Sequence, residues 1–226
     1  QGELSAKQIK SVRIEDLLER EPIVLDSENV KRELYGKRVL VTGAAGSIGS
    51  EIVRQCMHYG PEKVILLDQA ESALYELELE LKSKFKDFND KANCVIGDVR
   101  DYSRMRRIFD VFRPDIVFHA AAYKHVPLME DNPYEAVGVN VLGTKNIADL
   151  AVEFNSEKFV MVSTDKAVNP TNVMGATKRT AELYTQSLGQ QRNCNTQFIT
   201  TRFGNVLGSN GSVIPVFRKQ IAKGGP

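Results

Sequence analysis

The sequence has few of the residues that build metal sites and disulfide frameworks. Among 226 residues there are only three cysteines and three histidines. The cysteines include no CxxC pair and the histidines show no paired ligand spacing. We therefore assign no metal site and expect reduced thiols, as in a cytoplasmic protein. The cysteines are Cys56, Cys94 and Cys194, and the histidines are His58, His119 and His125.

A strong charge of one sign and long apolar runs are also missing. The 30 basic residues against 29 acidic ones leave a net charge of +1, which gives no electrostatic reason to expect nucleic acid as a partner. No run approaches the roughly 18–20 apolar residues of a membrane helix, so we expect this part of the chain not to contact a membrane. It starts at Gln1 without methionine and stops at a turn-like Lys223-Gly224-Gly225-Pro226, which we interpret as boundaries within a longer protein.

Short apolar runs alternate with helical patterns from Lys37 onward. The runs are typical of strands buried on both faces and lie at 38–42, 63–68, 93–97, 115–119, 158–162 and 197–202. Helices are expected at 47–58, 71–86, 102–112, 133–154 and 173–190. The alternation predicts βαβ units and hence an α/β fold, a doubly wound parallel sheet with helices on both faces.

A glycine-rich segment joins the first expected strand to the first helix. Its spacing is GxxGxxG, which permits a tight turn and lets the backbone and the helix N-terminus approach a pyrophosphate. Asp68 ends the second strand, where a carboxylate can accept hydrogen bonds from the ribose hydroxyls and would repel a 2′-phosphate. We therefore expect NAD rather than NADP, against the alternative of a glycine turn and a surface aspartate. The expected contacts in the segment are Gly43, Ala45, Gly46, Ser47, Ile48 and Gly49.

Two further strand ends belong to the same expected cofactor edge. Asp98, beside Val99, follows the third strand and is a candidate contact to the adenine, although capping the next helix is a comparable alternative. Small side chains at Ala120, Ala121 and Ala122 follow the fourth strand, where a cofactor would pass close to the backbone.

The fifth strand leads into Thr164, Asp165 and Lys166, which place a hydroxyl, a carboxylate and an amine at the edge where such sheets bind ligands. Lys178 lies twelve residues beyond Lys166 on the next helix. We expect all four beside the nicotinamide. The alternative is an ordinary exposed ion pair between Asp165 and Lys166.

These motifs together resemble the extended short-chain dehydrogenase/reductase family, and more closely its polysaccharide-biosynthesis branch of UDP-N-acetylglucosamine 4,6-dehydratases. The resemblance covers residues 37–226. It is carried by VTGAAGSIGSE (41–51), HAAAYKHVPLMEDNP (119–133), STDKAVNPTNVMGATK (163–178) and RFGNVLGSNGSVIPVF (202–217). It implies an NAD-binding Rossmann domain at 37–203 and the start of a small, truncated substrate-binding subdomain at 204–226. It also implies a lead-in at 1–36 that is similar to the linker from a membrane part.

One position departs from the wider family, which carries Tyr-x-x-x-Lys with the tyrosine as a base. Met174 stands at the tyrosine position while Lys178 is retained. Methionine cannot transfer a proton, so an epimerase mechanism is compromised. By resemblance, methionine here marks the large, membrane-anchored dehydratases, which act on the cytoplasmic face of the membrane, and favours retention at carbon 5.

The resemblance also suggests roles in a dehydration that passes through a 4-keto sugar. Lys166 is the expected base at carbon 5, and Asp165 the acid at the hydroxyl leaving carbon 6. Asp165 is also the leading candidate for deprotonating the carbon 4 hydroxyl, directly or through water. Thr164 would hydrogen-bond the carbon 4 oxygen, and Lys178 would hold the nicotinamide ribose.

The substrate side is less well marked. The partner implied is a UDP-sugar, and a homo-oligomer is expected. Candidate contacts to the sugar nucleotide are Lys124, Asn205, Ser212, Val213 and Phe217. Two other functions stay open: a nucleotide-sugar 4-epimerase on the same fold, and a non-catalytic NAD-binding module, which would bind cofactor without forming a keto sugar.

Overall fold

Six parallel strands form the central sheet of the protein, in the order β3-β2-β1-β4-β5-β6. The computed structural model describes residues 26–206, 217, 220–221 and 223–225. Within these, residues 27–204 form one compact unit. The strands are β1 (Arg38–Thr42), β2 (Lys63–Asp68), β3 (Ala92–Ile96), β4 (Ile116–His119), β5 (Lys158–Thr164) and β6 (Gln197–Phe203). The predicted doubly wound parallel sheet is therefore confirmed.

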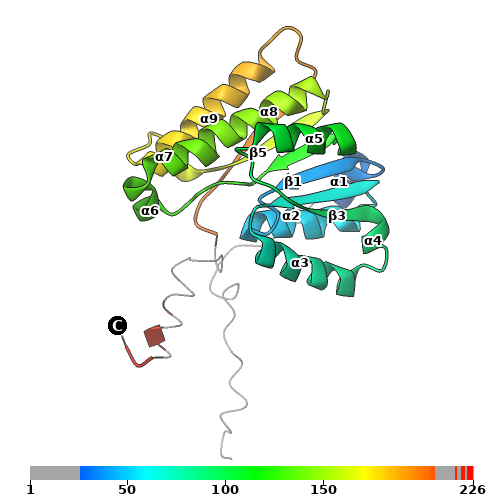
Figure 1. Ribbon diagram of the computed structural model, residues 1–226, viewed down its shortest axis with the longest axis horizontal. Coiled ribbons are helices and arrows are strands. Elements are labelled where there is room, and N and C mark those ends of the chain that lie inside the picture. Colours follow the sequence, from blue (N-terminus) through cyan, green and yellow to red (C-terminus); the bar gives the residue numbers. More distant parts are fainter. Residues whose placement is uncertain (1–25, 207–216, 218–219, 222, 226) are drawn as a thin grey trace, which may run out of the picture. The chain divides into compact units, whose positions relative to one another are not determined.

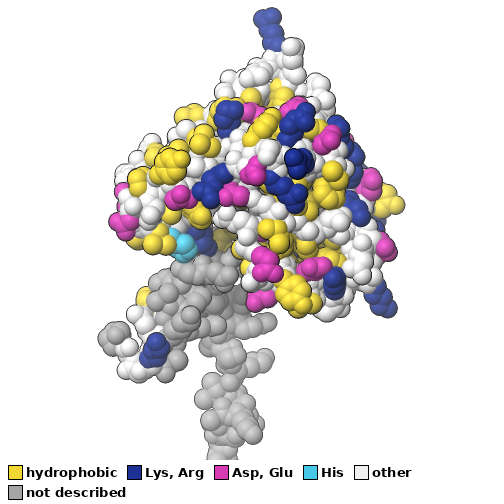
Figure 2. Space-filling model, in the orientation of Figure 1, with side chains coloured by type: hydrophobic (Ala, Val, Ile, Leu, Met, Phe, Trp, Pro, Cys, Tyr) yellow, Lys and Arg dark blue, Asp and Glu magenta, His cyan; other side chains and the backbone are white. Residues whose placement is uncertain are grey.

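Helices cover both faces of this sheet (Figure 1). On one face lie α5 (Tyr102–Phe112), α8 (Thr144–Glu153) and α9 (Val173–Gly189), and on the other α1 (Ser27–Leu34), α2 (Ser47–His58) and α3 (Glu71–Lys84). Shorter helices are α4 (Phe88–Lys91), α6 (Val126–Asp131) and α7 (Pro133–Ala136). Figure 2 shows acidic and basic side chains interspersed over α5 and α8, as expected of helices with one solvated side.

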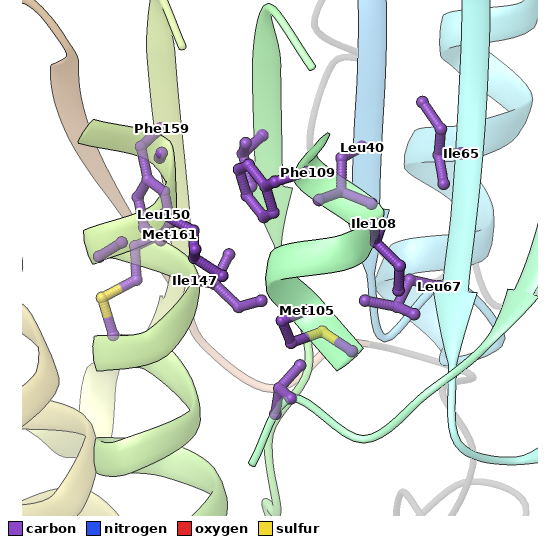
Figure 3. Packing of buried hydrophobic residues seen from close by; sticks show 14 of the residues in the cluster. Leu40, Ile65, Leu67, Met105, Ile108, Phe109, Ile147, Leu150, Phe159 and Met161 are labelled. Carbon is purple, nitrogen blue, oxygen red and sulfur yellow. The ribbon is translucent and has the colours of Figure 1, made fainter. Parts of the chain in front are cut away.

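The strand sequences explain why both faces are covered. Successive residues of a strand point to opposite faces, so a continuous apolar run buries side chains in two cores. In β1, Val39 and Val41 enter the core beneath α1, α2 and α3, whereas Leu40 enters the core beneath α5 and α8. Figure 3 shows this second core, with Leu40 near Ile108 of α5.

Residues 133–153 are helical, close to the single helix expected over 133–154, but the helix type changes along them. α7 passes into a π-helical segment, Val137–Gly143, which passes into α8. Buried Asn140 lies in this segment. Such π-helical stretches are rare and occur often at functional sites.

All six strands end at one edge of the sheet because they are parallel. The order reverses between β1 and β4, which opens a crevice at the strand ends where such folds bind ligands. The pairing of β5 with β4 stops at Met161, whereas its pairing with β6 continues to Thr164 opposite Phe203. β5 therefore extends two residues further than the predicted 158–162 and carries Thr164 as its last residue.

Candidate active site

The glycine-rich turn packs against the chain that follows β4. Gly43 has a φ of +67°, and a β-carbon there would lie 2.6 Å from the backbone nitrogen of Ala121. A β-carbon at Gly49 would lie 2.0 Å from the carbonyl oxygen of Gly43. Both positions therefore require glycine, because any side chain would push α2 or the β4 extension out of place. The turn holds the start of α2 at the crevice.

Asp68 fixes this turn. Its Oδ2 accepts a hydrogen bond of 2.9 Å from the backbone N–H of Ala45, and its Oδ1 accepts one of 2.9 Å from Ala70. A carboxylate has about four acceptor sites, so these two bonds leave capacity for two ribose hydroxyls. Asp68 thus holds the glycine-rich turn in place and retains acceptor capacity for a ligand.

A cavity of about 260 Å³ lies between these elements. It is lined by most of the predicted cofactor contacts, namely Gly43, Ala45, Gly46, Asp68, Asp98, Val99, Ala120, Ala121 and Ala122. The lining also includes Gln69, Ala73, Tyr123 and Val139, which sequence reasoning missed. Ser47, Ile48 and Gly49 lie in the first turn of α2 and are not part of the lining.

Asp98 lines the cavity and does not cap the next helix. Asp101 is the N-cap of α5 and accepts a bond of 3.0 Å from the backbone N–H of Arg104. Asp98 instead pairs with the guanidinium of Arg100, which holds the pKa of Asp98 below its ordinary value through these hydrogen bonds. The carboxylate is therefore ionised at the mouth of the cavity.

Buried His119, at the end of β4, links β1 to α8 through its two ring nitrogens. Its Nε2 lies 2.9 Å from Thr144 Oγ1, which donates to the carbonyl of Asn140, so Nε2 carries the proton. Its Nδ1 then accepts from Thr42 Oγ1 at 2.8 Å. Burial, with a smaller contribution from the charge of Lys178, lowers the pKa of His119 to about 3. His119 is therefore a neutral structural link.

Asn140 extends this network to α9. Its side-chain amide accepts from the backbone N–H of Tyr123 at 2.9 Å and donates to the Tyr123 carbonyl at 3.0 Å. The same amide donates to Thr177 Oγ1 at 3.1 Å. The π-helical segment thus holds both a cavity-lining loop and the residue before Lys178.

The predicted catalytic residues at the end of β5 form one local cluster. Thr164 Oγ1 donates to Asp165 Oδ1 at 3.0 Å, and Lys166 Nζ donates to the same oxygen at 3.1 Å. These bonds, from Lys166 first and Thr164 second, hold the pKa of Asp165 below its ordinary value. Asp165 is therefore an ionised carboxylate at neutral pH. In this form it can act directly as a base, whereas it must first accept a proton to act as an acid.

Gly175 brings α9 against this cluster. A β-carbon at Gly175 would lie 2.2 Å from the carbonyl oxygen of Lys166. Only glycine allows that approach, which sets the start of α9 directly beside the turn at Asp165–Ala167. The cluster at the end of β5 therefore lies beside the helix that carries Lys178.

Lys178, one turn further along α9, is buried and lacks a partner. Its Nζ is the single buried side-chain nitrogen or oxygen without a hydrogen bond among the described residues. Burial lowers the pKa of Lys178 to about 8, and the charge of Glu182 opposes this effect. A buried amine without partners is costly, so this group points to a ligand that completes its hydrogen bonds.

Met174 is buried in a small apolar cluster and does not line the cavity. It packs with Met129 of α6 and Ala136 of α7, and Tyr123 and Val126 lie against the cluster. The site thus has no proton-transferring side chain at this position of α9.

The predicted substrate contacts are only partly described. Lys124 is exposed between β4 and α6. Asn205 and Phe217 fall outside the compact unit of residues 27–204, and Ser212 and Val213 lie outside the described residues. Over the described part of the chain, no helix is long and apolar enough to cross a membrane.

Comparisons with known proteins identify the family of the chain. The sequence model of a family described as polysaccharide biosynthesis protein matches residues 39–226. The whole chain is 53% identical to capsular polysaccharide biosynthesis protein CapD of Staphylococcus aureus, of which it covers 37%. Over 84% of its length it is 40% identical to UDP-N-acetylglucosamine 4,6-dehydratase (inverting) of Campylobacter jejuni, of which it covers 55%.

A similar solved structure contains NAD. UDP-glucose 4-epimerase of Thermus thermophilus, in complex with NAD, has a TM-score of 0.72 and 29% identity, and the match covers 84% of this chain and 64% of that one. The present chain spans roughly a third to a half of the curated relatives, namely 37% and 55% of the two named above. The chain belongs to the polysaccharide biosynthesis protein family, a branch of the extended short-chain dehydrogenases/reductases that comprises nucleotide-sugar dehydratases and epimerases on a Rossmann fold.

Proposed function

We propose that this chain carries the catalytic centre of a 4,6-dehydratase that acts on UDP-N-acetylglucosamine and forms a UDP-4-keto-6-deoxy sugar with loss of water. One observation carries the proposal. A hydroxyl, a carboxylate and an amine meet within 3.1 Å at the end of β5, beside the helix of Lys178, and Met174 replaces the tyrosine that would serve an epimerase. The set can move protons at two sugar carbons without a tyrosine.

The residues present fit NAD. The partnerless Nζ of Lys178 would bond the hydroxyls of the nicotinamide ribose, and Asp68 those of the adenosine ribose. Gly43, Ala45 and Gly46 line the cavity next to the start of α2, where the helix N-terminus would meet the pyrophosphate. An aspartate at position 68 disfavours the 2′-phosphate of NADP. When bound, the nicotinamide would accept a hydride from the sugar and return it, so the net reaction is dehydration.

The chain's own residues would handle the protons. Thr164 would hydrogen-bond the carbon 4 oxygen, and ionised Asp165 would take the proton from the carbon 4 hydroxyl. Once protonated, Asp165 is equipped to give that proton to the hydroxyl leaving carbon 6. Lys166, whose Nζ lies 3.1 Å from the same carboxylate, would in its neutral amine form take the proton from carbon 5, which the neighbouring ketone makes acidic. It would return a proton to carbon 5 when carbon 6 receives the hydride, so that only water is lost.

Two other functions make different predictions. In the wider family a 4-epimerase uses a tyrosine at position 174 to take and return the carbon 4 hydroxyl proton, and buried Met174 cannot fill that role. A non-catalytic module would bind NAD and leave the sugar unchanged.

The product of a dehydratase would serve bacterial surface-glycan or glycoprotein synthesis. We further propose that the whole protein is membrane-anchored, with this part on the cytoplasmic side, and forms a homo-oligomer.

The test is product analysis. The full-length protein is incubated with UDP-N-acetylglucosamine and NAD, and the sugar is followed by NMR. A methyl signal from carbon 6 together with a 4-keto carbon supports the proposal. The 4-epimer would assign the chain to the epimerases, and unchanged sugar with bound NAD would make it a binding module.

A further inference from the structure

Glu182 is a completely buried carboxylate on α9 that no step of the proposed reaction uses. Both of its oxygens are fully engaged. Oε1 accepts from Ser163 Oγ at 2.7 Å and from Arg202 Nε at 2.9 Å, and Oε2 accepts from Arg202 Nη2 at 2.6 Å. Oε2 also accepts from Arg179 Nη1 at 2.9 Å. The side chain of Glu182 is 0% exposed, whereas both arginines are more than a third exposed.

The partners of Glu182 lie at the points where the site is assembled. Ser163 directly precedes Thr164 and Asp165, and it pairs with Arg202 across β5 and β6. Lys178 precedes Glu182 by one helical turn. A single carboxylate thus connects the end of the strand that carries the cluster, the end of β6 and the helix that carries the partnerless amine.

We propose that Glu182 is a positioning residue of the active site, which locks the ends of β5 and β6 to α9 and supplies the negative charge that keeps the ammonium of Lys178 available for the cofactor. Glu182 touches neither cofactor nor substrate in this proposal and acts through Ser163, Arg202 and Lys178. The cofactor part of the inference rests on the proposed NAD site.

The charges around α9 support this role. Burial alone would raise the pKa of Glu182, but the bonds from Arg202, Ser163 and Arg179 outweigh it and lower the pKa to about 2. The ionisable groups on elements packed against α9 or near Lys178 include His119, Glu130, Asp149, Asp165, Lys166 and Arg202. Within the described residues, only Glu182 raises the pKa of Lys178, and neutral His119 adds no positive charge that would lower it.

The experiment measures NAD affinity against pH by calorimetry on the intact protein after cofactor removal. E182Q keeps the shape and removes the charge, and E182D keeps the charge and shortens the side chain. The matched control is D115N, because Asp115 receives a similar two-bond fork from Arg38 at the opposite edge of the sheet, with N–O distances of 2.7 and 3.1 Å.

In the wild type and D115N, NAD binding is expected to weaken as pH rises through the pKa of Lys178. In E182Q the same loss should begin at lower pH, by roughly half a unit to one unit, because Glu182, one helical turn from Lys178, carries the opposite charge that raises the pKa of Lys178. E182D should weaken binding at every pH and keep the wild-type midpoint.

A purely structural Glu182 would give a different pattern. E182Q would then weaken NAD binding equally at all pH values, with no shift of the midpoint, and that result overturns the proposal. If E182Q does not fold, E182D provides the test. Since E182D keeps the charge, a midpoint lowered by the roughly half a unit to one unit expected for loss of the charge also overturns the proposal. These readouts need no turnover, so they remain decisive even if product analysis shows that the protein is not a dehydratase.

Discussion

Replacing Lys178 with methionine should stabilise the cofactor-free protein while weakening its hold on NAD. Lys178 is 4% exposed and its Nζ has no hydrogen-bond partner. Methionine is similar in length and has no charge to desolvate. The substitution therefore removes a buried charge without leaving a large cavity.

The magnitude follows from the pKa of Lys178. Burial lowers it from 10.5 to about 8, and a pKa difference of that size corresponds to about 3 kcal/mol of penalty on the charged form. Because the folded-state pKa lies below the unfolded-state pKa, the penalty is fully present below pH 8. It is relieved between pH 8 and 10.5, where the unfolded chain holds the proton and the folded protein has lost it. The free energy of unfolding of the wild type should therefore rise with pH over that window.

Urea denaturation at pH 7 and at pH 10, without NAD, measures the effect. K178M should exceed the wild type by up to about 3 kcal/mol at pH 7, and the difference should shrink at pH 10. Saturating NAD should stabilise the wild type and have less effect on K178M. The control is K86M, which removes an exposed lysine. Equal stabilities of K178M and the wild type at both pH values would refute the reasoning.

Three other substitutions test separate parts of the site. K166M should lower dehydration by on the order of 10²- to 10⁴-fold and abolish deuterium wash-in at carbon 5, and full retention of both would remove Lys166 from the mechanism. D68A should weaken NAD binding by about tenfold or more, because it removes the acceptors for the ribose hydroxyls and for the backbone N–H of Ala45. It should also reduce the preference for NAD over NADP. Calorimetry with each cofactor measures both effects. G175A should destabilise the protein by about 1–3 kcal/mol and reduce turnover, because the new methyl group would lie 2.2 Å from the carbonyl oxygen of Lys166. The control G138A should leave the stability nearly unchanged, because its methyl group would lie 3.4 Å from the flexible side chain of Arg100. Equal losses of stability in urea denaturation would contradict this account.

The sequence predicted the sheet because its signals are local. The runs at β1 and β2 are continuous, apolar and rich in β-branched residues, and their predicted bounds agree with the structure. β5 runs on to Thr164 because it continues to pair with Phe203 of β6. Pairing of that kind depends on a segment almost forty residues away in the sequence, so the pattern of β5 itself could not reveal it.

The parts of the site that sequence reasoning missed depend on tertiary contacts. The π-helical segment is tied to the amide of Asn140, which bonds the backbone of Tyr123 in another loop. The burial of Met174 depends on α6, a short helix that was not predicted. Glu182 follows Lys178 on a helix, where a glutamate usually faces solvent. Only the distant Arg202 and Ser163 explain why it is buried.

The lining of the cavity was easier to predict, because a glycine turn, a strand-end acid and small residues each follow a strand. Its role as a cofactor site stays a prediction. In parallel sheets such segments meet at one edge whatever the details of packing. The cavity is indeed lined by Gly43, Asp68 and Ala120. The roles of Thr164, Asp165 and Lys166 stay predictions, since proximity to one another does not by itself place a substrate beside them.

A crystal structure of the full-length protein with NAD and a UDP-sugar bound would test the central claim most directly. The account predicts ribose hydroxyls within hydrogen-bonding distance of Lys178 Nζ. It also predicts sugar carbons 4 to 6 between the nicotinamide and the side chains of Asp165 and Lys166. A sugar bound away from the end of β5, with those two side chains facing solvent, would contradict the dehydratase assignment and leave only a dinucleotide-binding fold.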